Sequence, residues 1–155
     1  VTVISLADYP MPIFDEDLEV SEGMPAAAKA FKQLLIDHDG LLIASPEYNS
    51  AFSPLLKNAI DWATRPFGPD IKSAPPFAGK YAAIMATSPG ALGGLRGLVF
   101  LRLLLSNIAV TVMPSQHAVP HAAKVFDADG SINDTQVQQK IMDLGKALAQ
   151  ELLKK

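Results

Sequence analysis

The chain has 155 residues, of which 49% are hydrophobic and 19% are charged, and its formal net charge is -3. This length and balance predict one domain, residues 1–155, that buries a core of its own. The mild negative charge argues against a nucleic-acid binder, which would present a basic face. The apolar runs are too short to span a membrane. The lack of cysteine excludes a disulfide scaffold and a thiolate metal site, and it predicts a cytoplasmic protein.

Strands and helices are expected to alternate along the chain, because apolar runs without helical spacing alternate with runs that have it. The expected strands span residues 1–6, 40–44, 80–87 and 109–113. The expected helices span residues 25–38, 54–64 and 95–107, with a last helix that begins at Asn133. The acidic stretch from Asp8 to Gly23 is interpreted as a solvated loop, and no metal site is predicted there. The alternation predicts an α/β fold, a doubly wound parallel sheet.

The most informative segment joins the strand 40–44 to the helix 54–64. The strand, Gly40 to Ala44, is apolar without alternation, as in a strand that is covered on both faces. Ser53 followed by Pro54 predicts a helix start, because a serine hydroxyl can cap a free N–H and proline suits the first helical position. The loop Ser45 to Phe52 therefore follows the carboxyl end of a strand, which is where open α/β sheets bind ligands.

Within this segment, the run Pro46-Glu47-Tyr48-Asn49-Ser50 and the later run Leu56-Lys57-Asn58-Ala59-Ile60-Asp61-Trp62 resemble the NADPH-dependent FMN reductase family. The family consists of flavodoxin-like enzymes that include quinone, azo-dye and chromate reductases. The similarity extends from Leu6 through the C-terminal helix and covers nearly the whole chain. It implies a flavodoxin-like sheet in three layers, FMN as the cofactor and NADPH or NADH as the co-substrate.

The resemblance also implies which residues bind the flavin. In the family this loop lines the isoalloxazine ring, with backbone amides near the pyrimidine edge. The corresponding residues here are Pro46, Glu47, Tyr48, Asn49 and Ser50. Fixed N–H donors beside a helix N-terminus suit an edge that becomes negative on reduction, and a tyrosine ring offers a flat wall. The flavin carries the reaction, so no catalytic side chain is predicted.

A second loop, residues 88–97, is rich in glycine and leads into the helix 95–107. Glycine lets the backbone approach a ligand without an intervening side chain, although such a loop can also be a plain turn. In the family, the corresponding loop closes on the other side of the flavin. The resemblance therefore implies cofactor contacts for Ser88, Gly90 and Gly93.

The helix 95–107 is apolar almost all round, so it must be covered on more than one side. A second subunit is the preferred cover, which predicts a homodimer or homotetramer. Phe52 and Trp62 are expected in the core or in subunit contacts. The histidines His38, His117 and His121 show no paired metal spacing and are expected to be exposed or hydrogen-bonded.

Aligned by the resemblance, Val1 corresponds to the second strand of the family, so the first strand, the phosphate-binding loop and the first helix have no counterpart here. Three explanations stay open: an upstream segment outside this chain, a deliberate truncation, or a natural variant that has lost the cofactor. The first is preferred, because deletion of a central strand would leave two strand edges unpaired.

The predicted function is an FMN-dependent oxidoreductase that passes hydride from NAD(P)H through FMN to a small-molecule electron acceptor, such as a quinone or an azo compound. The alternatives are a flavodoxin-like electron carrier and an interaction protein without a cofactor. Arg65, Lys72 and Arg96 could each meet the 2′-phosphate that distinguishes NADPH from NADH. The proline-rich connection 65–79 is a candidate lid or interface element.

Overall fold

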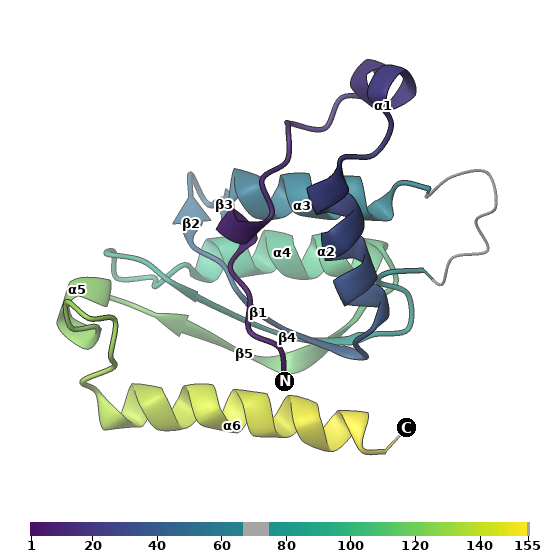
Figure 1. Ribbon diagram of the computed structural model, residues 1–155. Coiled ribbons are helices and arrows are strands. Elements are labelled where there is room, and N and C mark those ends of the chain that lie inside the picture. The colour runs from purple at the N-terminus through teal and green to yellow at the C-terminus, as the bar shows by residue number, and fades with distance from the viewer. Residues whose placement is uncertain (67–74, 155) are drawn as a thin grey trace. The chain divides into compact units, whose positions relative to one another are not determined.

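A parallel sheet of three strands organises one part of the chain in the computed structural model, which describes residues 1–66 and 75–154 (Figure 1). In spatial order the strands are β1 (Gly40–Ala44), β4 (Tyr81–Thr87) and β5 (Thr111–Val119). The central strand β4 has small side chains, and both Ala82 and Ala83 are fully buried. The expected strands 40–44 and 80–87 are thereby confirmed. Most of the expected lid lies outside the described residues, as does Lys72.

The chain divides into two units. The first comprises Val1–His38 and Pro54–Ala78, and the second comprises Asp39–Ser53 and Gly79–Lys155. The parallel sheet belongs to the second unit. A single domain over residues 1–155 stays a prediction.

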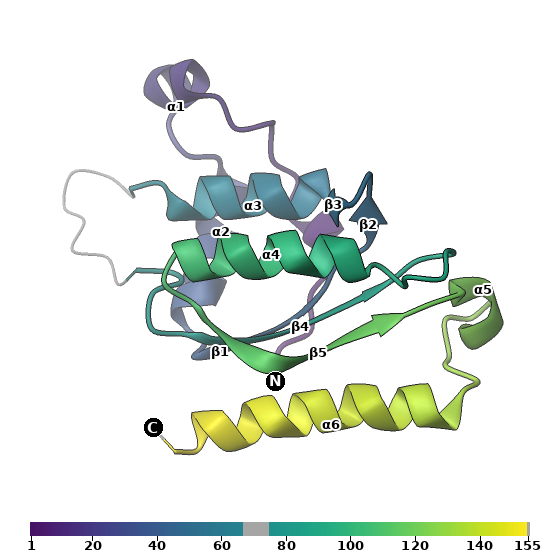
Figure 2. The same cartoon turned by 180° about the vertical axis from the view of Figure 1, so that it is seen from behind.

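In the second unit, two long helices lie on opposite faces of the sheet (Figures 1 and 2). The further elements of this unit are β2 (Glu47–Tyr48), β3 (Ala51–Phe52), α4 (Leu95–Asn107), α5 (Ala122–Val125) and α6 (Thr135–Leu152). Gly94, which precedes α4, packs against Ala86 of β4, whereas Leu144 of α6 packs in a cluster with Ala83. Because side chains alternate along a strand, Ala83 and Ala86 point to opposite faces. This unit therefore has three layers, with the sheet in the middle.

The first unit is helical. Its elements are the 3₁₀ turn η1 (Leu6–Asp8) and the helices α1 (Glu16–Glu22), α2 (Ala26–Ile36) and α3 (Pro54–Thr64). Trp62 of α3 is fully buried and clusters with Met24 and Ala28. The ring of Phe14 meets the indole edge-on, with 5.1 Å between the ring centroids. The expected core position of Trp62 is confirmed.

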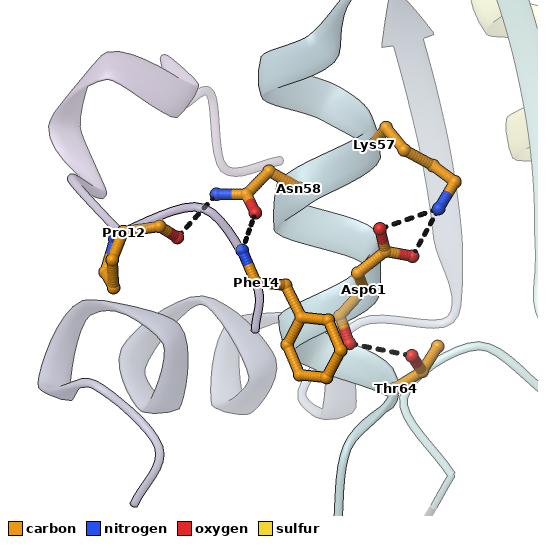
Figure 3. A network of polar contacts seen from close by, with 6 residues as sticks. All are labelled: Pro12, Phe14, Lys57, Asn58, Asp61 and Thr64. Carbon is orange, nitrogen blue, oxygen red and sulfur yellow. Dashed lines mark hydrogen bonds and ion pairs between the residues drawn. The ribbon is translucent and has the colours of Figure 1, made fainter. Parts of the chain in front are cut away.

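Side chains of α3 hold the segment around Pro12 (Figure 3). Asn58 donates from Nδ2 to the Pro12 carbonyl at 2.9 Å and accepts from the Phe14 N–H at 2.7 Å. The Trp62 indole N–H donates to the same Pro12 carbonyl at 2.8 Å. Lys57 and Asp61 pair with each other along the helix at 2.6 Å. In this structure Asn58 and Trp62, both part of the family motif, fix a loop of the first unit.

Arg65 joins several elements of the first unit. Its Nε lies 2.7 Å from Glu19 Oε2, and its guanidinium carbon lies 5.3 Å from the centroid of the Phe14 ring. The buried Lys32 donates from Nζ to the Arg65 carbonyl, and burial lowers the pKa of this lysine. The Arg65 guanidinium is thus engaged within the helical unit.

Two expectations for the N-terminal region were wrong. Residues 1–6 form no strand, and Val1 and Val3 are exposed. A β-branched run becomes a strand only when a partner strand pairs with it, and no described strand pairs with this one. The expected acidic loop contains α1, because Asp15 accepts from the Leu18 N–H at 3.0 Å and further acids occupy the positive first turn.

Two boundaries also differ from expectation. The last helix begins at Thr135, because the Asp134 carboxylate accepts from the Gln136 and Val137 N–H groups. Strand β5 continues to Val119, well past the expected end at Met113, in spite of Pro114. Its register against β4 shifts between Ala82 and Ile84, and such an irregularity accommodates a proline.

Candidate functional site

The two loops singled out in the sequence follow neighbouring parallel strands. β1 ends at Ala44, which pairs with Met85 of β4, and the Ser45 N–H donates to the Met85 carbonyl at 3.0 Å. β4 ends at Thr87, directly before the glycine-rich loop. Because the carboxyl ends of parallel strands share one edge of a sheet, both loops begin at the same edge. Ligands of open α/β sheets bind at such an edge.

The first loop, Ser45 to Phe52, contains a β-hairpin that the sequence analysis did not predict. Glu47 pairs with Phe52, and Tyr48 pairs with Ala51, which leaves a two-residue turn at Asn49 and Ser50. Both turn residues have positive φ, 51° and 68°. A type I′ turn needs this conformation at both positions, and it matches the twist of the flanking strands.

Most of the hairpin residues that are predicted to contact the ring are exposed. Tyr48 is 57% exposed, Pro46 and Asn49 are exposed, and Ser50 is half-buried. The buried Ser45 closes the base of the hairpin, because its Oγ accepts from the Ser53 N–H at 3.3 Å and donates to the Pro46 carbonyl at 3.1 Å. A short, closed hairpin thus carries a tyrosine ring beside a turn.

Glu47 differs from the other residues of the hairpin. Its side chain is only 9% exposed, and its Oε2 accepts from the Gly97 N–H of α4 at 2.9 Å. Its Oε1 lies 3.3 Å from Arg96 Nη2. The carboxylate is therefore committed to the start of α4, and only the backbone of Glu47 remains for the predicted contact with a ring.

The second loop owes its shape to close backbone packing. Gly93 is buried with a φ of 60°, and a Cβ there would lie 2.5 Å from Pro120 N and from the Val119 carbonyl carbon. Gly94 has a φ of 89°, and its Cβ would lie 2.6 Å from Ala86 Cβ. Both glycines are required by the fold itself, whatever the loop binds.

Gly90 is different, since it is exposed and a Cβ there would meet no atom nearer than Ser88 Oγ at 3.9 Å. Its carbonyl accepts from the N–H of His121 at 3.2 Å, and the Ser88 carbonyl accepts from the N–H of Ala122 at 3.1 Å. These bonds tie the loop to the segment that follows β5. The half-buried Ser88 and the exposed Gly90 stand on the open side of the loop.

The histidines have different surroundings. His38 is hydrogen-bonded to the Leu34 carbonyl and His121 is exposed, as expected. His117 departs from the expectation, because its Nε2 is buried without a hydrogen-bond partner among the described residues. Burial lowers the pKa of His117, and the positive charge of Lys140 lowers it further. His117 lies within β5, opposite Met85.

The sequence model of the family described as NADPH-dependent FMN reductase matches residues 1–124. The chain belongs to this family. The match includes both loops and β1, β4 and β5. No group of three acidic or histidine side chains in residues 1–66 and 75–154 could hold a metal ion, and no helix there is long and apolar enough to cross a membrane.

Named relatives support the same family. The chain is 37% identical over 124 residues to a 2-hydroxy-1,4-benzoquinone reductase of a Burkholderia species, a match that covers 79% of this chain and 63% of the relative. It is 37% identical over 147 residues to an NAD(P)H-dependent FMN reductase of Pseudomonas aeruginosa, covering 94% of this chain and 76% of the relative. The chain thus spans less than two thirds of the length of the first of these relatives.

A solved structure gives the corresponding fold. The flavoenzyme NAD(P)H:(acceptor) oxidoreductase FerB of Paracoccus denitrificans superposes with a TM-score of 0.74 at 30% identity, over 92% of this chain and 74% of that protein. An oxidoreductase of Corynebacterium diphtheriae, at 20% identity and a TM-score of 0.64, shares the fold. The expected flavodoxin-like α/β fold is confirmed.

Sequence reasoning missed the part that α4 plays in the site. Gly97 packs against the hairpin, and Arg96 beside it is 59% exposed. Of the three cations considered for a 2′-phosphate, Arg65 is engaged in the helical unit, Lys72 lies outside the described residues, and Arg96 adjoins the loops. A glycine inside an apolar helix disfavours the helix, so its presence was a signal of close packing.

Proposed function

We propose that the protein is an FMN-dependent oxidoreductase that passes hydride from NADPH or NADH through FMN to a quinone, an azo compound or a similar acceptor. Membership of the family supports this proposal, as do relatives that are named for quinone and FMN reduction. The observation that carries it is the position of the exposed hairpin and the open glycine loop after adjacent parallel strands.

The donor set of the two loops fits a flavin ring. The turn residues Asn49 and Ser50 lie outside the hairpin ladder, so their N–H groups are available to the carbonyls and nitrogens of a pyrimidine edge. Tyr48 supplies an exposed aromatic face for stacking. At Gly90 no side chain stands between the backbone and a ligand. These residues, with Pro46, Ser88 and the backbone of Glu47, would hold the ring.

When bound, FMN supplies the two-electron chemistry, accepting hydride from the nicotinamide and releasing it to the acceptor. The chain contributes orientation and electrostatics. N–H groups fixed at the turn favour negative charge on the pyrimidine edge without reorganisation. The glycine loop, residues 88–94, has no ionisable side chain. A quinone that receives hydride also needs one proton, which we assign to solvent water.

Purification followed by a steady-state assay tests the proposal. Visible flavin absorbance, together with oxidation of NADPH or NADH that depends on an added quinone, is the expected result. Flavin without turnover would favour the electron carrier, and no affinity for flavin would favour the interaction protein. Comparing NADPH with NADH in the same assay decides the nicotinamide preference, and Arg96→Met should lower the preference if this residue meets the 2′-phosphate.

We also propose that the protein forms a homo-oligomer through α4. Apolar side chains project from this helix, with exposed fractions of 43% for Leu95, 59% for Val99, 51% for Phe100 and 67% for Leu103. An exposed apolar stripe of this kind marks an interaction surface. Sedimentation velocity should show a dimer or tetramer, and Leu103→Glu should shift it to the monomer. A wild-type monomer would contradict this proposal. A cytoplasmic location stays a prediction.

A further inference from the structure

We propose that the Glu47 carboxylate is a positioning residue that fastens the β2–β3 hairpin to the start of α4 and thereby fixes Tyr48 and Asn49 for ring binding. The inference rests on the proposed function, because ring binding is the property that the hairpin position would control. In this role the Glu47 side chain contacts α4 and does not contact the flavin directly.

Helix α4 begins without a side-chain cap of its own. Its N-cap residue is Gly94, which has no side chain to accept from the first N–H groups. The first turn of a helix leaves these groups without intrahelical partners. Gly97, in that first turn, donates its N–H to Glu47 Oε2, so a residue 50 positions away in the sequence does the capping. A carboxylate is favourable there because the helix dipole is positive at this end.

The hairpin packs directly on the backbone of α4. A Cβ on Gly97 would lie 3.2 Å from the Ala51 carbonyl oxygen and 3.4 Å from Glu47 Cβ. Glu47 immediately precedes Tyr48, the residue that flanks the turn. The carboxylate therefore anchors the hairpin one residue away from the groups that are proposed to hold the ring.

The two interactions of the Glu47 carboxylate, with the Gly97 N–H and with Arg96, differ in their exposure to water. The Glu47 side chain is 9% exposed, so its bond to Gly97 is shielded from water. The Arg96 side chain is 59% exposed and lies 3.3 Å from the carboxylate. Exposed ion pairs contribute little, whereas a buried N–H that loses its acceptor is costly. We therefore assign the positioning to the bond between Glu47 and Gly97.

Lumiflavin, the flavin ring system without the ribityl phosphate, is the probe for this inference, because it reports ring binding alone. The whole protein is titrated and quenching of the lumiflavin fluorescence is followed. Glu47→Ala should weaken binding by about tenfold or more, in line with the cost of an unsatisfied buried donor. Glu47→Gln keeps an acceptor oxygen for the Gly97 N–H and should stay within about threefold of the wild type. Arg96→Met should do the same, and the matched control Glu151→Ala on α6 should leave binding unchanged.

A second measurement needs no flavin. Amide hydrogen exchange should show faster exchange at Gly97 and Tyr48 in Glu47→Ala, with the core strand β4 unchanged and with protection restored in Glu47→Gln. This pattern separates a local loss of position from general unfolding.

The outcomes separate the two proposals. Wild-type protein that binds neither lumiflavin nor FMN overturns the proposed function, and the role of Glu47 in ring binding with it. Wild-type protein that binds, with Glu47→Ala equally tight, overturns the positioning role and leaves the proposed function intact. Equal weakening in Glu47→Gln and Glu47→Ala contradicts the assignment to the hydrogen bond with Gly97.

Discussion

The two loops at the carboxyl edge of the sheet are held in place by opposite means. The hairpin 47–52 is held by side chains, since Ser45 closes its base and Glu47 fastens it to α4. The loop 88–94 is held by the absence of side chains, since Gly93 and Gly94 allow backbone and strand to meet at distances that no Cβ would permit. Shortening a side chain lowers stability in proportion to the contacts it removes, whereas a close backbone contact leaves almost no room for an added side-chain atom.

This comparison predicts the largest effect for Gly93→Ala. The added methyl group would stand 2.5 Å from the backbone of β5 and its successor Pro120, at a φ of 60°. Left-handed strain and overpacking together should lower the free energy of unfolding by about 2–4 kcal/mol. Urea denaturation measures the loss.

Gly90→Ala in the same loop is the matched control for this variant. Its methyl group would meet no atom nearer than Ser88 Oγ at 3.9 Å, an ordinary contact distance, so the free energy of unfolding should change by less than about 0.5 kcal/mol. Equal losses in the two variants would contradict the packing explanation of Gly93.

Ser45→Ala should have a smaller effect. It removes the hydroxyl that accepts from the Ser53 N–H at 3.3 Å and donates to the Pro46 carbonyl. The expected loss is about 1 kcal/mol in the free energy of unfolding, the usual value for a hydrogen bond of this kind. Denaturant titration of Ser45→Ala, compared with Ser115→Ala at an exposed site, measures this loss. Equal losses of stability in the two variants would count against the role of Ser45.

A gain in stability is expected from Ser50→Gly. Ser50 has a φ of 68° at the second position of the hairpin turn, where glycine pays no Cβ penalty. The free energy of unfolding should rise by about 0.5–1 kcal/mol. Ser115→Gly within β5 is the control, and it should lower stability because glycine weakens a strand. A loss in Ser50→Gly would show that the side chain matters more than the backbone conformation.

The smallest effect concerns pH. Burial, and then the charge of Lys140, lowers the pKa of His117 below its ordinary value of 6.5. The unfolded chain therefore binds a proton first as the pH falls. The contribution of neutral His117 to the free energy of unfolding is complete above pH 6.5, and it is lost as the pH falls through the pKa of His117 in the folded protein. Thermal unfolding across this range should show a shallower slope in His117→Gln than in the wild type. An unchanged slope in His117→Gln would contradict this explanation.

Much of the fold could be predicted from local patterns. The apolar run of β1, the small-residue run of β4 and the periodicity of α2, α3 and α4 each carry their own signal. The run 1–6 has an equally clear strand composition, yet strand formation depends on a partner that composition does not reveal. Acidic residues also mark a helix start as readily as a solvated loop, which explains why α1 was missed.

The candidate site was predictable as a set of residues but not as an arrangement. The family motif pointed to the segment that forms the hairpin. The strands β2 and β3 of this hairpin have two residues each, which are too few to show an alternation of apolar and polar residues. The turn Asn49-Ser50 lacks the glycine that usually marks a type I′ hairpin. The direction of the Glu47 carboxylate depends on a contact with Gly97 that is long-range in sequence. No local pattern encodes such a contact.

Arg102 of α4 has a consequence for how copies of this chain can meet. Its guanidinium donates to the carbonyls of Val112 and Pro114 and to the side chain of Gln116, across the irregular part of β5. Within the described residues β5 has a strand neighbour on one side only. A proline and carbonyls already occupied by arginine make a poor template for another strand. This edge therefore resists growth of the sheet from one molecule into the next.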